Sequence, residues 1–336
     1  MQRRHFLHSA AVLSAGAGLS PIVMARDNTE TTSSKLVPLH RSFSLTDRTV
    51  RIHCDAVTQP VRLVMMADTH LGLQDAREEP FQQYSGRMAK AYVKTTNPIT
   101  RQPTTPQESF IEGLNAARKA RADLVTLVGD LFSFPSEANV DWALQELQKV
   151  ALPYLYVTGN HDWHYEGMEG SSEELRDTWI QKRLAPFFQG ADPLITSRDI
   201  KGVRIVMVDD STYQILPAQL ATFRKLIDEG LPTVVFLHIP LYVPGRHLGF
   251  GCGHPSWGAK ADKGYTIERR PPWRESGHTQ TTLDFHREIF AAPNVLGIFA
   301  GHTHQPPMDV VGSIPQIVTD DNASGGRLEI EILPMG

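Results

Sequence analysis

Short apolar runs of strand length alternate along the chain with longer segments in which apolar residues recur every three or four positions. The short runs predict buried strands, and the longer segments have the period of amphipathic helices. The predicted core strands are residues 61–66, 124–128, 154–157, 233–237 and 295–299. The predicted helices are residues 108–120, 137–149, 172–184, 217–228 and 281–291. Such alternation is typical of an α/β fold.

Both ends of this pattern are rich in strands. Residues 41–45 and 49–53 predict an edge hairpin, and residues 308–311, 314–318 and 327–333 predict three closing strands. We therefore expect a mixed sheet covered by helices.

Helix starts are marked by polar caps and by proline. The residues expected to begin helices are Ser136, Ser172 and Pro217. Two segments, residues 71–107 and 244–280, show neither the strand nor the helix period and are predicted as long loops of the domain.

Each predicted core strand is followed by polar residues that can bind metal. The five motifs are Asp68-Thr69-His70, Gly129-Asp130, Gly159-Asn160-His161-Asp162, His238 and Gly301-His302-Thr303-His304. Ligands of open α/β sheets bind outside the carboxyl ends of the strands, so we expect these side chains at one rim. Burying so many polar groups together is costly unless something binds them, and metal coordination is the usual solution.

The order and spacing of these motifs resemble the calcineurin-like metallophosphoesterase family, and the resemblance extends from residue 61 to about residue 333. It implies a four-layer α/β/β/α sandwich, in which two mixed β-sheets pack face to face between helices. The predicted domain comprises residues 41–336.

The resemblance also implies two divalent metal ions. It assigns one ion to Asp68, His70, Asp130 and His304, and the other to Asp130, Asn160, His238 and His302. Two adjacent cations need an anionic bridge, and the two oxygens of a carboxylate suit Asp130 to that position. Alternate residues of an extended segment point the same way, so His302 and His304 can serve both ions. Imidazole, carboxylate and amide ligands without thiolate favour Mn, Fe or Zn.

The implied activity is hydrolysis of a small phosphomonoester or phosphodiester by a hydroxide that bridges the metals. The resemblance makes His161 the general acid that protonates the leaving oxygen, with Asp162 as the partner of its ring. Purple acid phosphatases have a tyrosine where this chain has Ser133, so an iron–tyrosinate chromophore is not expected. Two alternatives remain, namely a phosphodiesterase of nucleotides or lipid headgroups, and a non-catalytic phosphate-binding module on the same fold.

The predicted loop at residues 244–280 carries six cationic and three acidic side chains in a chain whose formal charge is −4. A cationic loop over a metal site would attract an anionic substrate. The candidate substrate-binding residues are Arg246, Arg269, Arg270 and His164. The alternative is a solvated loop whose charges have no role.

The first 25 residues predict a targeting segment. Arg3 and Arg4 precede a weakly apolar stretch that ends at Ala25. This segment resembles a twin-arginine export signal, which implies passage through the twin-arginine machinery to the periplasm. A chance arginine pair at a cytosolic N-terminus is the alternative. Residues 26–40 are predicted as a linker.

Composition excludes several classes of protein. The negative charge argues against a nucleic-acid binder that depends on a basic surface. No apolar run reaches about 18 residues, so no membrane span is expected in the mature chain. Cys54 and Cys252 are too few for a disulfide framework and are expected as separate thiols, with a single bridge as the alternative.

Overall fold

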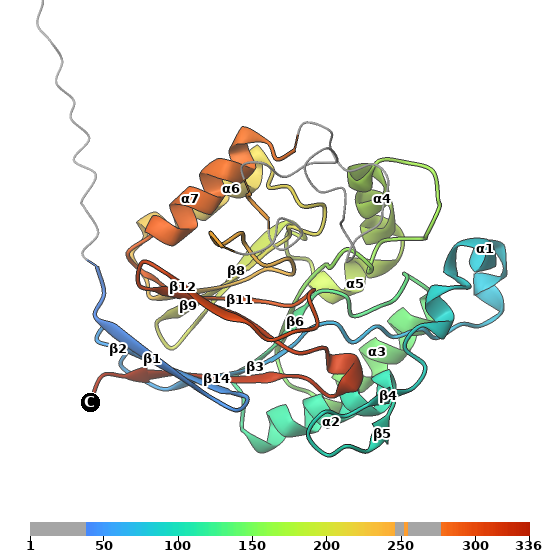
Figure 1. Ribbon diagram of the computed structural model, residues 1–336, viewed down its shortest axis with the longest axis horizontal. Coiled ribbons are helices and arrows are strands. Elements are labelled where there is room, and N and C mark those ends of the chain that lie inside the picture. The colour runs from blue at the N-terminus through green and yellow to red at the C-terminus, as the bar shows by residue number, and fades with distance from the viewer. Residues whose placement is uncertain (1–37, 246–251, 255–276) are drawn as a thin grey trace, which may run out of the picture. The chain divides into compact units, whose positions relative to one another are not determined.

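Two six-stranded sheets pack against each other in the computed structural model, which describes residues 38–245, 252–254 and 277–336 (Figure 1). The first sheet consists, in order, of β1 (Arg41–Thr46), β2 (Thr49–Cys54), β14 (Leu328–Pro334), β3 (Val61–Met66), β6 (Leu124–Val128) and β7 (Tyr154–Val157). The second consists of β12 (Met308–Val311), β13 (Ile314–Val318), β11 (Val295–Ala300), β10 (Thr233–Phe236), β9 (Val203–Val208) and β8 (Ile195–Ile200).

Both sheets are mixed, as the sequence predicts. The strands that precede the polar motifs pair in parallel, β3 with β6 and β6 with β7 in the first sheet, and β10 with β11 in the second. Antiparallel pairs form the outer parts, such as β1 with β2 and β8 with β9. Parallel pairing matters for function because it brings the carboxyl ends of neighbouring strands to the same edge.

The continuous apolar runs of the core strands arise because both faces of each sheet are covered. In β3, Val61, Leu63 and Met65 pack between the two sheets, whereas Val64 and Met66 pack beneath helices. A strand that is buried on both faces has no polar face to alternate with. The sequence of β3 therefore reads as a continuous apolar run from Leu63 to Met66, and the exposed Arg62 interrupts it only near its start.

Helices cover the outer face of each sheet. On the first sheet lie α2 (Pro106–Lys119) and α3 (Glu137–Val150), and on the second lie α6 (Pro217–Asp228) and α7 (Gln280–Ala291) (Figure 1). Ser136 caps α3 by accepting a hydrogen bond from the backbone of Asn139, and Pro217 lies in the first turn of α6, as expected. The resulting layer order is α/β/β/α.

The prediction was wrong in detail over residues 171–200. Helix α4 (Ser172–Trp179) is capped by Ser171, not by Ser172, and it continues as a π-helix, η3 (Ile180–Leu184), and as α5 (Ala185–Phe188). Ser171 and Glu174 form a reciprocal capping box, which fixes the start one residue earlier. Strand β8 was missed because an edge strand with the sequence ITSRDI has little apolar pattern.

Residues 71–107, predicted as one long loop, contain regular structure. They form the 3₁₀-helices η1 (Ala76–Phe81) and η2 (Met88–Lys90), the short helix α1 (Gln82–Ser85) and a hairpin of β4 (Thr95–Thr96) and β5 (Pro103–Thr104). The hairpin is fixed to the C-terminal part of the chain, because Thr95 Oγ1 donates to the carbonyl of Ala323 at 2.6 Å. Elements this short contain too few residues to show a regular spacing of apolar side chains, so the sequence did not predict them. We call residues 71–105, which precede α2, the insertion.

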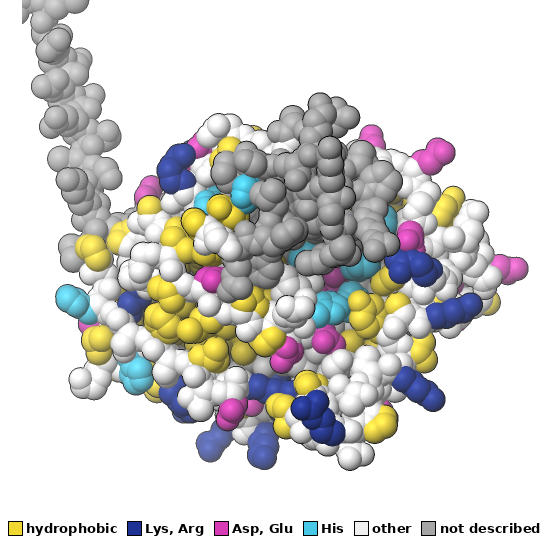
Figure 2. Space-filling view, in the orientation of Figure 1, with side chains coloured by type: hydrophobic (Ala, Val, Ile, Leu, Met, Phe, Trp, Pro, Cys, Tyr) yellow, Lys and Arg dark blue, Asp and Glu magenta, His cyan; other side chains and the backbone are white. Residues whose placement is uncertain are grey.

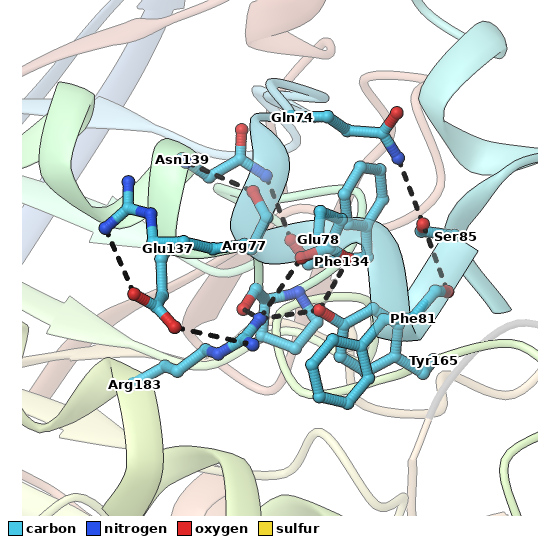
Figure 3. Close-up of polar contacts among 12 residues, drawn as sticks. Gln74, Arg77, Glu78, Phe81, Ser85, Phe134, Glu137, Asn139, Tyr165 and Arg183 are labelled. Carbon is cyan, nitrogen blue, oxygen red and sulfur yellow. Dashed lines mark hydrogen bonds and ion pairs between the residues drawn. The ribbon is translucent and has the colours of Figure 1, made fainter.

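A buried polar cluster attaches the start of the insertion to the rest of the fold (Figure 3). Glu78 accepts a hydrogen bond from the Tyr165 hydroxyl at 2.7 Å, and its other oxygen lies 3.3 Å from Arg183 Nη1. The Arg183 guanidinium lies 4.8 Å from the Phe81 ring centroid and 4.9 Å from that of Trp179. The charge of this buried pair is thus balanced and surrounded by aromatic rings.

Neither cysteine of the described chain forms a disulfide. Cys54 and Cys252 are buried as free thiols, in different apolar clusters. No helix within the described ranges is long and apolar enough to cross a bilayer. The predicted export signal and most of the predicted linker, up to residue 37, lie outside the described residues.

The buried pair gives a stability prediction. Replacing Arg183 by leucine leaves the Glu78 carboxylate buried without its cation, and we expect the free energy of unfolding to fall by about 3–5 kcal/mol. The double variant Glu78→Leu/Arg183→Leu should recover a large part of that loss. Urea unfolding followed by circular dichroism measures both.

The exposed pair formed by Arg224 and Glu288, with side chains 50% and 28% exposed, provides the control. Arg224→Leu should have a much smaller effect on unfolding, because solvent already screens that pair. Equal losses for Arg183→Leu and Arg224→Leu would contradict the assigned role of the buried cluster.

Candidate metal centre

The polar motifs predicted from the sequence meet at the carboxyl ends of five strands, β3, β6, β7, β10 and β11. Two groups of side chains present ligand atoms within 4.8 Å of one another, the first formed by Asp68, His70 and His304 and the second by Asp130, His238 and His302. We call these the first and second groups. Figure 2 shows histidine side chains beside acidic ones on this face of the molecule.

In the first group, two imidazoles and a carboxylate converge. His70 Nε2 lies 3.1 Å from His304 Nε2, and His304 Nε2 lies 3.3 Å from Asp68 Oδ1. The other oxygen of Asp68 accepts a hydrogen bond from the His302 backbone at 2.8 Å. The loops after β3 and β11, one from each sheet, are thereby joined through Asp68.

In the second group, the histidine after β10 meets the carboxylate after β6. His238 Nε2 lies 3.2 Å from Asp130 Oδ2 and 3.1 Å from Asn160 Oδ1. His238 Nδ1 lies 3.0 Å from the Val128 carbonyl, to which it can donate a proton. That hydrogen bond leaves Nε2 as the nitrogen that can bind a metal.

Asp130 lies between the two groups. Its Oδ2 is 3.2 Å from His238 Nε2 in the second group and 4.0 Å from His70 Nε2 in the first. Its Oδ1 accepts a hydrogen bond from the His161 backbone at 2.7 Å. This geometry supports the shared position that the sequence predicts for this carboxylate.

Strained backbone accompanies this convergence. Asp68, His70, Asp130, His302 and His304 all have φ between 48° and 73°, in the left-handed region that non-glycine residues rarely adopt. Strain of this kind persists only when surrounding contacts enforce it, and it gathers at functional sites.

Two motif glycines allow the loops to approach one another. A Cβ added at Gly159 would overlap the backbone nitrogen and Oδ1 of Asp130, and one at Gly129 would overlap the ring of His238. Gly129 also has φ of 74°, which glycine adopts without strain. The glycines of these motifs are therefore required by close packing around the second group.

The electrostatics of the two groups suit a cation. Burial lowers the pKa of His238, but the charge and hydrogen bond of Asp130 raise it to about 10. Likewise, burial lowers the pKa of His304, and Asp68 raises it to about 9. The carboxylates thus stabilise positive charge in a buried place.

Two further observations fit a metal. Burial holds the pKa of His70 and of His302 well below the usual value, so both rings are neutral, the form that binds metal. Asp68 Oδ1 is buried and receives no hydrogen bond within the described residues. The side chains of both groups therefore fit divalent cations.

The sequence profile of calcineurin-like phosphoesterases matches residues 61–306. The chain belongs to this family. The matched range contains every residue of both groups, together with Asn160, His161 and the insertion.

The other similarities of this calcineurin-like phosphoesterase to known proteins are weaker. A "Probable cyclic nucleotide phosphodiesterase" from Moraxella catarrhalis (strain BBH18) is 36% identical over 59 residues, which are 18% of this chain and 21% of that protein. This chain thus matches about a fifth of that relative.

Two solved structures resemble this phosphoesterase weakly. A dimetal phosphatase from Danio rerio has 12% identity and a TM-score of 0.48, with 79% of this chain and 88% of that chain covered. The purple acid phosphatase PPD1 from yellow lupin (Lupinus luteus) has 14% identity and a TM-score of 0.46, with 83% and 48% covered.

Asp162 lies where two loops of this phosphoesterase meet. Its two oxygens accept hydrogen bonds from the backbone of Gly159 at 2.7 Å and of Phe132 at 2.8 Å, so it joins the two loops, and its role as the partner of the His161 ring stays a prediction. Burial and the nearby charge of Asp130 raise the pKa of Asp162 to about 7. The sequence did not predict that Asp162 joins two loops, because Phe132 lies outside the motif that contains Asp162.

Three residues of the site were missed or undervalued. Tyr213 Oη lies 2.7 Å from His302 Nε2, and the Tyr92 ring stacks on His70 with centroids 4.1 Å apart. Asp210 is buried and accepts a hydrogen bond from the Ile239 backbone at 3.0 Å, next to His238. Among these three residues, only Asp210 has a feature in the sequence that points to the site, namely its position just after β9.

The predicted substrate-binding residues are only partly described. His164 is half-buried, and its backbone donates to the carbonyl of His161 at 3.1 Å, so it lies in the same turn. Arg246, Arg269 and Arg270 lie outside the described residues.

The shared carboxylate gives a prediction about metal content. Asp130→Asn keeps an oxygen for the His161 backbone but removes the charge that would offset two cations, so metal should be lost from both groups. Metal analysis by mass spectrometry measures ions per chain. Asp123→Asn is the control, because that carboxylate pairs with Lys201 at 2.7 Å, next to the amino end of β6. Two ions per chain in Asp130→Asn would contradict the shared role.

Proposed function

We propose that this protein is a metal-dependent phosphoesterase that hydrolyses a small phosphomonoester or phosphodiester. The observation that carries the proposal is the position of Asp130, a buried carboxylate within 4.0 Å of an imidazole in each of two ligand groups. Membership of the calcineurin-like phosphoesterase family supports the same activity.

Seven side chains would hold the metals, namely Asp68, His70, Asp130, Asn160, His238, His302 and His304. When bound, two divalent ions would neutralise charge on the phosphoryl oxygens and activate the attacking water. The imidazole, carboxylate and amide donors support Mn, Fe or Zn, and no thiolate belongs to either group.

We assign the proton transfer to His161. Its backbone is tied to Asp130 Oδ1 at 2.7 Å, and its ring is 5.2 Å from the ring of His70, at the edge of the first group. The side chain is half-buried, so it can reach a bound ester while staying next to the metal ligands. In this position it would protonate the oxygen that leaves phosphorus.

A more specific activity, that of a phosphodiesterase of nucleotides or lipid headgroups, is the second candidate. Its support is the 59-residue match to a relative that is named as a cyclic nucleotide phosphodiesterase. Turnover of p-nitrophenyl phosphate and of bis-p-nitrophenyl phosphate by metal-reconstituted protein separates the two activities. Retention of two ions with turnover of neither compound would favour the third reading, a non-catalytic phosphate-binding module.

The general-acid assignment predicts how a His161 variant depends on its substrate. His161→Ala should lower kcat by a factor of about 10²–10⁴ for an ester with a poor leaving group. General acid catalysis usually accelerates a reaction by that factor. For p-nitrophenyl phosphate, whose leaving group needs little protonation, the loss should be much smaller. Metal content should remain at the wild-type value. Equal losses across leaving groups of different pKa would remove His161 from this role.

We further propose that residues 1–25 direct export by the twin-arginine pathway, on the support of Arg3, Arg4 and the weakly apolar stretch that follows. A metal site whose ligands span residues 68 to 304 requires a folded chain, so metal binding is coupled to folding. Export after folding would let the cytoplasmic metal supply determine which ions are bound.

The export proposal makes its own prediction. Replacing Arg3 and Arg4 together by lysine keeps the charge but removes the arginine pair, and the active, metal-loaded enzyme should accumulate in the cytoplasm. Activity assays on separated periplasm and cytoplasm measure the distribution. Normal periplasmic accumulation of the double variant would rule out this route.

A further inference from the structure

A cavity of about 570 Å³ opens beside the first ligand group, between the insertion and the start of α2. His70 lines this cavity and is also one of the candidate metal ligands. Pockets for small organic molecules have volumes of roughly 300–1,000 Å³. The cavity therefore adjoins the candidate metal centre and has the size of a ligand site.

Most of the cavity wall is apolar. Its apolar lining residues include Met88, Ala89, Tyr92, Val93 and Pro106. Tyr92 forms the boundary with the metal centre, because its ring lies parallel to that of His70, with an interplanar angle of 6°. Val93 is 55% exposed although it is a large aliphatic residue. An apolar group that entered the cavity would remove the Val93 side chain from water, which is favourable.

Polar groups are few and lie at two places on the wall. Lys94 and Gln107 are among the lining residues, one in the insertion and one in the first turn of α2. An apolar wall with a small number of polar side chains is the usual lining of a site for an organic molecule. The ammonium of Lys94 also adds positive charge to a site that would receive an anion.

The wall is held from both sides, so the cavity does not depend on ligand to form it. Before Tyr92, Glu78 is bound in the buried cluster with Arg183 and Tyr165 (Figure 3). After Tyr92, Thr95 Oγ1 is bound to the carbonyl of Ala323 at 2.6 Å. A site on supported segments loses little conformational entropy when a ligand binds.

We propose that this cavity is the subsite for the organic group of the phosphoester, and that it selects an apolar or aromatic group over a small hydrophilic one. The inference rests on the proposed phosphoesterase function. The ring of His161, the proposed general acid, lies 5.2 Å from that of His70. An ester oxygen protonated by His161 would therefore lie near His70, and the group attached to that oxygen would enter the adjoining cavity. Hydrolysis breaks the bond from phosphorus to this oxygen, forms a bond from phosphorus to the oxygen of water, and releases the organic group as an alcohol or phenol that carries a proton.

Val93 allows a sharp test, because the insertion contains a matched control. Ile99 is an aliphatic residue of the same insertion, 63% exposed, and is not among the residues that line the cavity. Val93→Asn and Ile99→Asn each replace an exposed aliphatic side chain by a neutral polar one. Any effect on solubility or on the fold of the insertion should therefore be shared by the two variants.

The measurement is kcat/KM of metal-loaded enzyme for 1-naphthyl phosphate and for glycerol 3-phosphate. We divide kcat/KM for 1-naphthyl phosphate by kcat/KM for glycerol 3-phosphate. Val93→Asn should lower this ratio by about tenfold, because loss of a small apolar contact in a specificity pocket usually changes kcat/KM by about that factor. Ile99→Asn should leave this ratio within about twofold of the wild type. Metal content per chain should be the same in all three proteins.

A second pair of variants tests the aromatic wall. Tyr92→Phe keeps the ring and should preserve the ratio, whereas Tyr92→Ala should lower it. An unchanged ratio in both Val93→Asn and Tyr92→Ala would overturn the subsite while leaving the phosphoesterase function in place. Failure of metal-loaded wild-type protein to hydrolyse these two monoesters and also bis-p-nitrophenyl phosphate would overturn the proposed function itself and the subsite with it.

Discussion

The position of one buried carboxylate, Asp130, determines much of the site. It has histidine nitrogens of both groups within 4.0 Å, and burial would raise its pKa, but His238 and His161 hold the pKa well below the usual value. An ionised carboxylate in such a place needs positive charge around it, since a buried charge is stable only when it is paired. The neighbouring loops are arranged to supply that charge, and their strained backbone and close glycine contacts follow from this requirement.

The two-sheet architecture makes this arrangement possible. Parallel strands bring Asp68, Asp130 and Asn160 to one edge of the first sheet, and they bring His238 and His302 to the matching edge of the second. The loops are then joined across the sheets by the hydrogen bond from the His302 backbone to Asp68. Because the two sheets share a packed interior, their ligands are held at fixed separation without any flexible linker.

The sequence predicts the core and the ligand motifs well because both depend on strong local patterns. Strands such as β11 (Val295–Ala300) are apolar and buried on both faces, and their ends are marked by glycine and by metal-binding residues. The features that the sequence does not predict depend on contacts between segments that are distant along the chain. Tyr92 lies in an insertion without a period, and its stacking on His70 follows from anchors at Glu78 and Thr95. The hydrogen bond that Asp162 accepts from the Phe132 backbone likewise joins two segments that a single motif does not relate.

Strand β14 completes the first sheet although it is formed by the C-terminal part of the sequence. It lies between β2 and β3 in the first sheet, and η4 (Asn322–Ser324), just before it, holds the β3 loop through hydrogen bonds from Asn322 and Ala323 to the carbonyls of Ala67 and Asp68. Every candidate ligand lies at or before His304, so synthesis of the ligands ends before synthesis of the strand that joins the halves of their sheet. A nascent chain therefore carries its full set of metal-binding side chains while the first sheet is still in two pieces. The strand that joins these two pieces leaves the ribosome after all of the candidate ligands.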